Sequence, residues 1–384
     1  MPDWGIYNKP IGSMFHHHNH PKVLFILKKR SAYGGNYSQS LSSGLFNSAS
    51  MVSQMLNCNG IFSKVVEVDD NNGIDRQVKH FKPTHVIIEA LWVVPSKFAV
   101  LQRLYPHIKW IVRIHSEVPF LANEGVAMEW LSEYVRYKNV FISFNSKRTN
   151  NEMKEYIFSK YGPFLAEKVV YLPNYYNLAD VQKNCHESNY STGCPCKNPD
   201  CILKDKWPNE DALHIGCFGA IRPMKNHLLQ AVSAMRMGDL LGRRVYFHIN
   251  TKRVEGRGEP VLKNLRNLFK GTDHQLVEHG WMERDNFLAV ASRMHLGMQV
   301  SFSETFNIVA ADMISQDVPI VVSNEIEFVA PFFKTSKTSS VSMVLSMMFA
   351  LTASKLKLHK LNEWLLKLSG MFAKRVWLDF LYCH

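Results

Sequence analysis

Short apolar runs alternate with longer amphipathic segments along most of the chain. In the first half these runs cover residues 22–27, 64–68, 85–89, 109–114, 140–144 and 168–172. Runs this short and almost continuously apolar are typical of parallel strands that are covered on both faces. Helical patterns lie between them, at residues 37–56, 96–105, 125–136 and 147–160. Regular alternation of strand and helix predicts a doubly wound α/β domain over residues 21–174.

The rhythm stops at residues 175–212, an insertion with four cysteines and no hydrophobic period, and then resumes. The second series of predicted strands covers residues 213–218, 244–250, 275–278, 295–300 and 318–322. Predicted helices cover residues 224–237, 260–270, 283–292 and 305–315. We therefore expect a second Rossmann-like domain over residues 213–335, facing the first across a central cleft. Parallel sheets bind ligands outside the carboxyl ends of their strands, and both sheets would present those ends to the cleft.

The two ends of the sequence differ from this pattern. Residues 336–384 carry apolar positions at helical spacing, so we expect helices there that pack back on the domains. Residues 1–20 read as a flexible leader without a secretion signal. No stretch reaches the roughly 18 apolar residues of a membrane-spanning helix. These features predict a cytoplasmic protein, or one of the host-cell cytoplasm if the protein is viral.

Composition narrows the class of protein further. Hydrophobic residues make up 46% of the chain and charged residues 20%, which excludes a disordered protein. The formal net charge of +12 favours an anionic partner, such as a nucleotide, nucleic acid or an acidic membrane surface. The charge alone does not choose among these partners.

Glycines mark two turns from a strand into a helix. Gly34 and Gly35 follow the first predicted strand, where they would let a ligand approach the backbone closely or serve turn geometry alone. Gly219 follows the first strand of the second domain, with Arg222 and Lys225 just before a helix. A glycine turn, two cations and a helix N-terminus favour a site for a diphosphate over a solvated basic loop.

Two acidic residues follow in the second domain. Glu304 comes directly after a strand, at the predicted start of a helix, and Asp312 lies eight residues further on. On a helix this spacing is a little over two turns, which would bring both carboxylates near one face and toward the cleft. There they could accept hydrogen bonds from the hydroxyls of a sugar. The alternative is a helix-terminal charge and a solvated acid.

Together these residues resemble a known family. Residues 213–322, with Gly219, Arg222, Lys225 and the pair Glu304 and Asp312 ahead of the sequence Asp-Val-Pro-Ile-Val-Val, are similar to the donor-binding half of GT-B glycosyltransferases of retaining family 4. The family usually has Glu where this chain has Asp312. The resemblance implies a glycosyltransferase that moves a sugar from a nucleotide sugar, with a UDP-sugar as the expected donor, to an acceptor hydroxyl. Because the sequence has no Asp-x-Asp motif, we expect retention of configuration without a catalytic metal.

The resemblance also implies roles for individual residues. Arg222 and Lys225 would hold the diphosphate and stabilise it as it leaves, since charge develops there in the transition state. Glu304 would position the transferred sugar and Asp312 the ribose. Backbone N–H groups of residues 305–307 (Thr305, Phe306 and Asn307) would lie near the sugar and phosphates. His115, after the strand at residues 109–114, would contact the sugar or the acceptor, or else be a buried strand-end histidine.

The insertion contains Cys185, Cys194, Cys196 and Cys201 within 17 residues. Four soft ligands in one loop suit tetrahedral zinc in a structural site, although the usual C-x2-C pairs are absent. Free thiols or a redox pair are the alternatives.

The acceptor is the open question. A glycan or glycoconjugate is the first expectation, and DNA with hydroxymethylated pyrimidine bases is the alternative that the basic charge supports. A third interpretation is a non-catalytic nucleic-acid-binding protein on the same fold. The presence of Glu304, Arg222 and Lys225 favours an enzyme over this binding protein, because a site that has lost its activity would tend to lose these residues.

Overall fold

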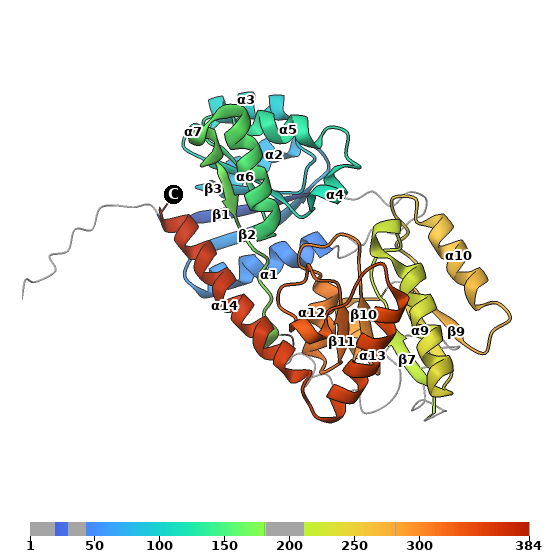
Figure 1. Ribbon diagram of the computed structural model, residues 1–384. Helices are drawn as coiled ribbons and strands as arrows, with labels where there is room; N and C mark the ends of the chain where they lie inside the picture. Colours follow the sequence, from blue (N-terminus) through green and yellow to red (C-terminus); the bar gives the residue numbers. More distant parts are fainter. Residues whose placement is uncertain (1–19, 30–43, 180, 182–210, 281, 384) are drawn as a thin grey trace, which may run out of the picture.

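The computed structural model describes residues 20–29, 44–179, 181, 211–280 and 282–383. They form two lobes, each built on a parallel sheet, and a long C-terminal helix that runs along both (Figure 1). The predicted fold class, two Rossmann-like domains with C-terminal helices, is confirmed.

The first sheet has six strands in the order β2-β1-β3-β4-β5-β6. Their bounds are β1 Lys22–Lys28, β2 Phe62–Val68, β3 His85–Glu89, β4 Lys109–Ile114, β5 Val140–Phe144 and β6 Val169–Tyr171. Alternate residues of β1 pack into different cores, because successive side chains of a strand point to opposite faces. Leu24 and Ile26 join one core, whereas Val23 and Phe25 join the other.

Helices cover both faces of this sheet. They are α1 Gly44–Cys58, α2 Gly73–Phe81, α3 Pro95–Leu104, α4 Val118–Leu121, α5 Ala127–Tyr134, α6 Lys147–Tyr161 and α7 Pro163–Ala166. Helix α1 lies between the two lobes (Figure 1), and its Met51 packs into the core of the second domain. Helices α2, α4 and α7 were not predicted.

The second sheet has five strands in the order β11-β10-β7-β8-β9. The strands are β7 Leu213–Gly216, β8 Val245–Asn250, β9 Gln275–His279, β10 Leu296–Gln299 and β11 Ile320–Val322. The helices around them are α9 His227–Leu241, α10 Glu259–Phe269, α11 Arg284–Ala291 and α12 Ile308–Ser315, with single 3-10 turns at Pro223–Lys225 and Pro331–Phe333.

Helices α9 and α12 begin later than predicted. Asn226 and Asn307 directly precede them with left-handed backbone, at φ of 57° and 60°. The Asn307 side chain also accepts a hydrogen bond from the Ala310 amide, which caps α12. Both left-handed residues lie just before the helix, so residues 219–225, with their 3-10 turn, and residues 300–306 are not part of either α-helix.

The strand orders fix where a ligand can bind. In the first sheet β2 and β3 lie on opposite sides of β1, and in the second β8 and β10 lie on opposite sides of β7. At β1 and at β7 the order in which strands are added across the sheet therefore changes direction. The loops that leave the two neighbouring strands at such a point diverge and open a crevice at the carboxyl end of the sheet. The loops after β7 and β10 therefore form the part of the second domain that is suited to bind a ligand.

A chain of buried histidines crosses the second sheet. His214 on β7 contacts His248 on β8 at 2.9 Å, and His248 contacts His279 on β9 at 2.8 Å. The amide of His214 donates to His295 Nδ1 at 3.0 Å. Burial lowers the pKa of His214 to about 3 and that of His279 to about 4, and it also lowers the pKa values of His248 and His295. All four rings are therefore neutral near neutral pH.

Two helices, α13 Ser340–Lys355 and α14 Lys360–Cys383, follow the second sheet. Leu366 of α14 packs into the second-domain core, whereas Trp377 packs into the first-domain core beside Phe25. The Trp377 indole N–H donates to the Pro173 carbonyl at 2.8 Å. Helix α14 therefore completes both domains.

No single helix within the described residues is both long and apolar enough to cross a membrane. Helices α13 and α14 reach that length and composition only when they are taken together, and they meet at an angle of 95°.

Candidate active site

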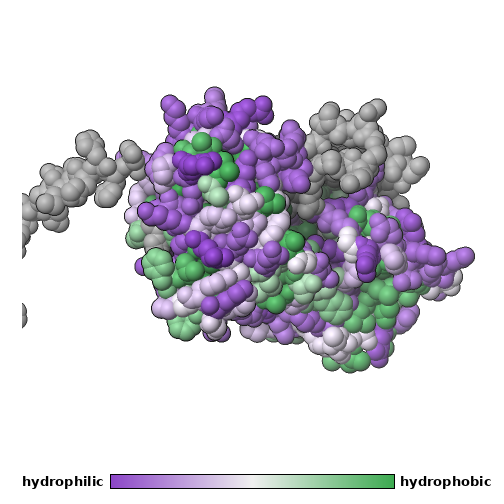
Figure 2. Space-filling model, turned by 90° about the horizontal axis from the view of Figure 1, so that it is seen from above, coloured by the Kyte–Doolittle hydropathy of each residue, from purple (hydrophilic) through white to green (hydrophobic). Residues whose placement is uncertain are grey.

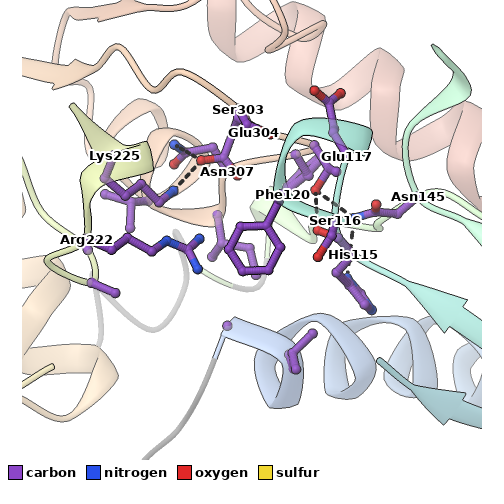
Figure 3. A pocket seen from close by; sticks show the side chains of 18 of the residues that line it. His115, Ser116, Glu117, Phe120, Asn145, Arg222, Lys225, Ser303, Glu304 and Asn307 are labelled. Atoms are coloured by element: carbon purple, nitrogen blue, oxygen red, sulfur yellow. Dashed lines mark hydrogen bonds and ion pairs between the residues drawn. The ribbon is translucent and has the colours of Figure 1, made fainter. Parts of the chain in front are cut away.

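A pocket of about 340 Å³ lies between the carboxyl ends of the two sheets (Figure 3). The first domain lines it with residues that follow β3, β4 and β5 and with the start of α1. The second domain lines it with the loops after β7 and β10 and with the start of α12. The polar and charged lining residues include His115, Ser116, Glu117, Glu124, Asn145, Asn174, Arg222, Lys225, Arg253, Glu255, Ser303, Glu304, Thr305 and Asn307.

Hydrogen bonds to the buried side chain of Gln230 hold the two loops of the second domain together. Its amide group donates to the carbonyl of Lys225, and its oxygen accepts from the amide of Val300, both at 2.8 Å. The amide of Phe302 donates to the Met224 carbonyl at 2.9 Å. The loop after β7 therefore has a fixed position against the loop after β10.

An ion pair between Lys225 and Glu304 joins these loops at the pocket wall (Figure 3). The contact uses Glu304 Oε2, which also accepts from Asn307 Nδ2 at 3.1 Å and from the Ser301 hydroxyl at 3.5 Å. No described residue donates a hydrogen bond to Oε1. Three donors on one oxygen orient the carboxylate and leave its other oxygen able to accept a hydrogen bond from a ligand.

Arg222 extends from the second domain toward the first. Its guanidinium lies over the ring of Phe120, with 4.9 Å from the guanidinium carbon to the ring centroid, and Figure 3 shows the two side chains facing each other. Gly219, at the start of the same loop, has a φ of 118°, and a side chain on it would meet no atom within 4 Å. The backbone conformation, rather than crowding, therefore favours glycine here.

The first domain contributes a buried charged network. The Glu89 carboxylate on β3 contacts Arg113 at 3.1 Å and also binds Nε2 of His115. Arg113 donates further to Asn174 Oδ1 at 2.6 Å and to the Pro173 carbonyl at 3.0 Å. Burial opposes charge on Glu89, but Arg113 and His115 outweigh it and lower its pKa.

The same network fixes the His115 ring. Burial lowers the pKa of His115, although Glu89 opposes this change. With Nε2–H donating to Glu89, the other nitrogen, Nδ1, accepts from Asn145 Nδ2 at 3.3 Å. His115 is therefore a neutral, oriented imidazole at the pocket wall.

Hydrogen bonds also cross the pocket from one domain to the other. Asn145 donates to the Thr305 hydroxyl at 3.1 Å, and that hydroxyl donates to the His115 carbonyl at 3.2 Å. Thr305 therefore ties the loop after β10 to both β4 and β5 of the first domain.

The structure brings together most of the residues that the sequence singled out. The pocket lining includes His115, Gly219, Arg222, Lys225, Glu304, Thr305, Phe306 and Asn307. The Phe306 side chain is buried against Phe328, so its backbone is the part that can face a ligand. Gly34, Gly35 and the four cysteines of the insertion lie outside the described residues. Among the residues that the structure describes, no group of three or more His, Cys, Asp or Glu side chains is arranged to hold a metal ion.

Asp312 departs from the expectation, because it is buried away from the pocket. Its carboxylate pairs with Arg284 at 2.6 Å and accepts from the Tyr176 hydroxyl at 2.7 Å. Glu304 precedes the left-handed Asn307 and lies outside α12, so the spacing of eight residues does not correspond to two helical turns. Asp312 therefore does not share a face with Glu304.

Sequence reasoning missed the residues behind the pocket wall. Glu89 and Arg113 are charged residues within otherwise apolar strands, a pattern that indicates a buried pair. Glu117 was also missed. It lines the pocket, accepts from Ser146 and pairs with Arg148, and burial raises its pKa against the effect of that arginine.

Two Rossmann-like domains with a pocket between the carboxyl ends of their sheets define a protein of the GT-B fold. No protein-family model matches the chain, and no curated protein matches its sequence. Solved structures do match, however, and they include trehalose-phosphate synthases.

A UDP-forming α,α-trehalose-phosphate synthase from Burkholderia vietnamiensis is 13% identical, with a TM-score of 0.68 over 96% of this chain and 98% of its own. An E. coli structure bound with UDP-2-fluoro glucose is 10% identical, with a TM-score of 0.66 over 94% of this chain and 99% of its own. A synthase from Burkholderia xenovorans in complex with glucose-6-phosphate is 11% identical, with a TM-score of 0.62 over 81% and 76%. The similarity establishes the GT-B fold, but it does not confirm family 4.

Proposed function

We propose that the protein is a glycosyltransferase that moves a sugar from a nucleotide sugar to an acceptor hydroxyl. The observation that carries this proposal is the cluster of Arg222, Lys225 and Glu304 in the crevice where the strand order of the second sheet reverses. The similarity to synthases described as UDP-forming makes a UDP-sugar the first donor to test.

Arg222 and Lys225 suit the diphosphate of the donor. Both line the pocket on the loop after β7, and Lys225 ends a 3-10 turn that only Asn226 separates from α9. As the bond to the sugar breaks, negative charge grows on the leaving phosphate. Cations fixed at that position stabilise the transition state more than the bound substrate, and such stabilisation raises the rate.

Glu304 suits the transferred sugar. Its Oε2 is held by Lys225 and Asn307, so Oε1 can accept a hydrogen bond from a sugar hydroxyl without reorganisation. The backbone of residues 305–307 and the His115 ring line the same pocket and would complete the sugar site. Asp312 has no part in this proposal.

We extend the proposal to transfer with retention and without a catalytic metal, on the resemblance of residues 213–322 to retaining enzymes. A carbohydrate or glycoconjugate is the proposed acceptor. The complex of the Burkholderia xenovorans synthase with glucose-6-phosphate adds sugar phosphates to the acceptors worth testing. The comparisons give no support to a DNA acceptor.

The test has a binding step and a transfer step. We expect UDP or another nucleoside diphosphate to raise the melting midpoint of the protein, because a ligand that binds only the folded state stabilises it. Incubation with UDP-glucose and a panel of sugars and sugar phosphates should then give a product one hexose heavier by mass spectrometry. NMR of the anomeric proton would report retention. Failure of every nucleotide to shift the midpoint, with no transfer to any acceptor, would overturn the proposal and favour a binding protein.

A further inference from the structure

The turn between α13 and α14 and the start of α14 expose several apolar side chains at the end of the second domain remote from the first (Figure 1). Leu356 is 70% exposed, Leu358 48% and Trp364 56%, and Leu361 is also exposed. We call these four residues, together with Lys355 and Lys357, the elbow surface.

The apolar face continues along α13. Val341, Leu345 and Phe349 are exposed and recur every four residues, so they lie on one side of the helix. The opposite side is occupied, since Met343, Met347 and Ala350 are buried in the second-domain core. Figure 2 views the molecule from above, the side remote from this turn, and there hydrophobic and hydrophilic residues are interspersed.

The exposed side chains are not the result of a loose chain end. Behind them, buried His359 binds Asp317 at 2.9 Å, and buried Asn362 accepts from the amide of Ala330 at 2.8 Å. The amide of Leu358 donates to the Ala353 carbonyl at 3.0 Å, which closes the end of α13. The fold therefore holds the elbow in place while its leucines point outward.

Basic residues alternate with the leucines. The order is Lys355-Leu356-Lys357-Leu358, and Lys360 follows two residues later. The acids nearby already have partners, because Asp317 pairs with His359 and Lys360, and Glu363 pairs with Lys367. Lys355 and Lys357 have no ion-pair partner among the described residues, so the elbow surface carries a net positive charge.

We propose that the elbow surface binds the surface of an anionic lipid bilayer. Leucines and a tryptophan that project from a fixed turn can enter the boundary between headgroups and acyl chains, while lysines reach the phosphates with their stems on the apolar surface. Trp364 is part of this surface, and tryptophan is enriched at membrane–water boundaries. A protein partner is a poorer fit, because lysine is depleted at the core of protein interfaces.

The bound orientation lays the turn on the bilayer and does not insert either helix across it. The inner sides of α13 and α14 pack into the domain cores through Met347, Leu366 and Trp377. The described residues that line the pocket include none from α13, α14 or the turn between them, so the pocket and the elbow surface are separate. This proposal does not depend on the proposed function.

Co-sedimentation of the full chain with vesicles tests this proposal by measuring how much protein binds. One set of vesicles contains phosphatidylcholine alone, and the other contains phosphatidylcholine mixed with phosphatidylglycerol. We expect binding to the mixed vesicles only, weaker at high salt, because lysines near an anionic surface act by electrostatic attraction. Leu356→Ser/Leu358→Ser keeps the charge and should reduce the binding constant by about tenfold or more. Lys355→Glu/Lys357→Glu should reduce it by at least as much.

The controls separate the elbow surface from general basicity. Lys263→Glu/Lys270→Glu makes the same charge change at two exposed positions, one on α10 and one directly after it, and should bind like the parent protein. Phe164→Ser removes an exposed aromatic from the first domain and should also bind like the parent. Melting midpoints verify that every variant is folded.

Three results would overturn the proposal. The parent protein could fail to sediment with anionic vesicles, or the elbow variants could bind as well as the controls. A dimer by light scattering that Leu356→Ser/Leu358→Ser dissolves, without lipid binding by the parent, would assign the elbow surface to a second copy of the chain.

Discussion

At the scale of single residues, Lys225 and Arg113 show two different uses of a cation. Lys225 lies at the pocket wall and pairs with Glu304, whereas Arg113 is fully buried and pairs with Glu89. Burial of a charge costs free energy that only a well-placed partner offsets. The Arg113 pair is therefore a structural element behind His115, whereas the Lys225 pair lies where a ligand can reach both of its members.

Lys225→Ala should abolish most transfer activity and leave the fold intact. The lost cation should cost about 2–4 kcal/mol of transition-state stabilisation, similar to the loss of one oxyanion-hole donor. Steady-state kinetics with a UDP-sugar measure the change in kcat, and the melting midpoint measures the fold. Lys263→Ala, at an exposed position of α10, is the control. Equal kcat values for Lys225→Ala and the parent would remove Lys225 from the site.

Glu89→Gln should destabilise the protein by about 3–5 kcal/mol, because it leaves Arg113 as an uncompensated buried charge. Glu278→Gln breaks the exposed pair between Glu278 and Arg266 and should cost less than about 1 kcal/mol. Denaturant unfolding measures both. The role of Glu89 in the core would be refuted by similar, small losses in the two variants.

The sequence predicted the pocket from residues whose place follows from local pattern. Gly219, Arg222, Lys225 and Glu304 each come just after a strand, and strand ends in parallel sheets meet at one edge. Asp312 was misplaced because the prediction needed the start of α12, which the left-handed Asn307 moves three residues later than expected. A single backbone conformation of this kind is not evident from side-chain pattern.

At the scale of elements, all the strands of both sheets were predicted, with ends that shifted by a few residues. A parallel strand that is covered on both faces is apolar along its length whichever strands lie beside it, so its own residues reveal it. Helix α2 was missed although Ile74, Val78 and Phe81 repeat at helical spacing, because it spans only nine residues. The charged residues of β3 and β4 were visible in the sequence, but their pairing depends on sheet order, which no single strand encodes.

The histidine chain of the second sheet should make the protein sensitive to acid. The folded pKa values of His214 and His279, about 3 and about 4, lie below the usual 6.5. At a pH between these folded values and 6.5, the unfolded chain binds more protons than the folded one. The free energy of unfolding is therefore highest above about pH 6.5 and falls as the pH drops below it. The loss is up to about 1.4 kcal/mol per pH unit for each histidine.

Unfolding free energies measured between about pH 7 and about pH 5 test this expectation. The slope of this free energy against pH counts the protons that the chain takes up on unfolding. His279→Gln should lower that count by about one, whereas His107→Gln, at an exposed position of the first domain, should leave it unchanged. Stability that stays constant over this range would refute the expected acid sensitivity.

At the scale of the whole molecule, α14 makes the two domains interdependent. Trp377 is fully buried in the first domain and stacks on Arg113, with 5.2 Å between the guanidinium carbon and the ring centroid. Trp377→Ala should therefore cost about 3–5 kcal/mol. Trp364→Ala, on the exposed side of the same helix, should cost far less. Denaturant midpoints compare the two variants, and equal losses would show that α14 does not complete the first core.

The position of Trp377 also determines the order in which the protein can be finished during synthesis. Domains generally fold as units as the chain leaves the ribosome, at ~5–20 residues per second. Here the strand that carries Phe25 is made before the rest of both domains, but the side chain that packs against it arrives only after the second sheet is complete. The nascent first domain therefore waits on the order of tens of seconds with an open apolar face. The domain that is translated first is the last to be completed.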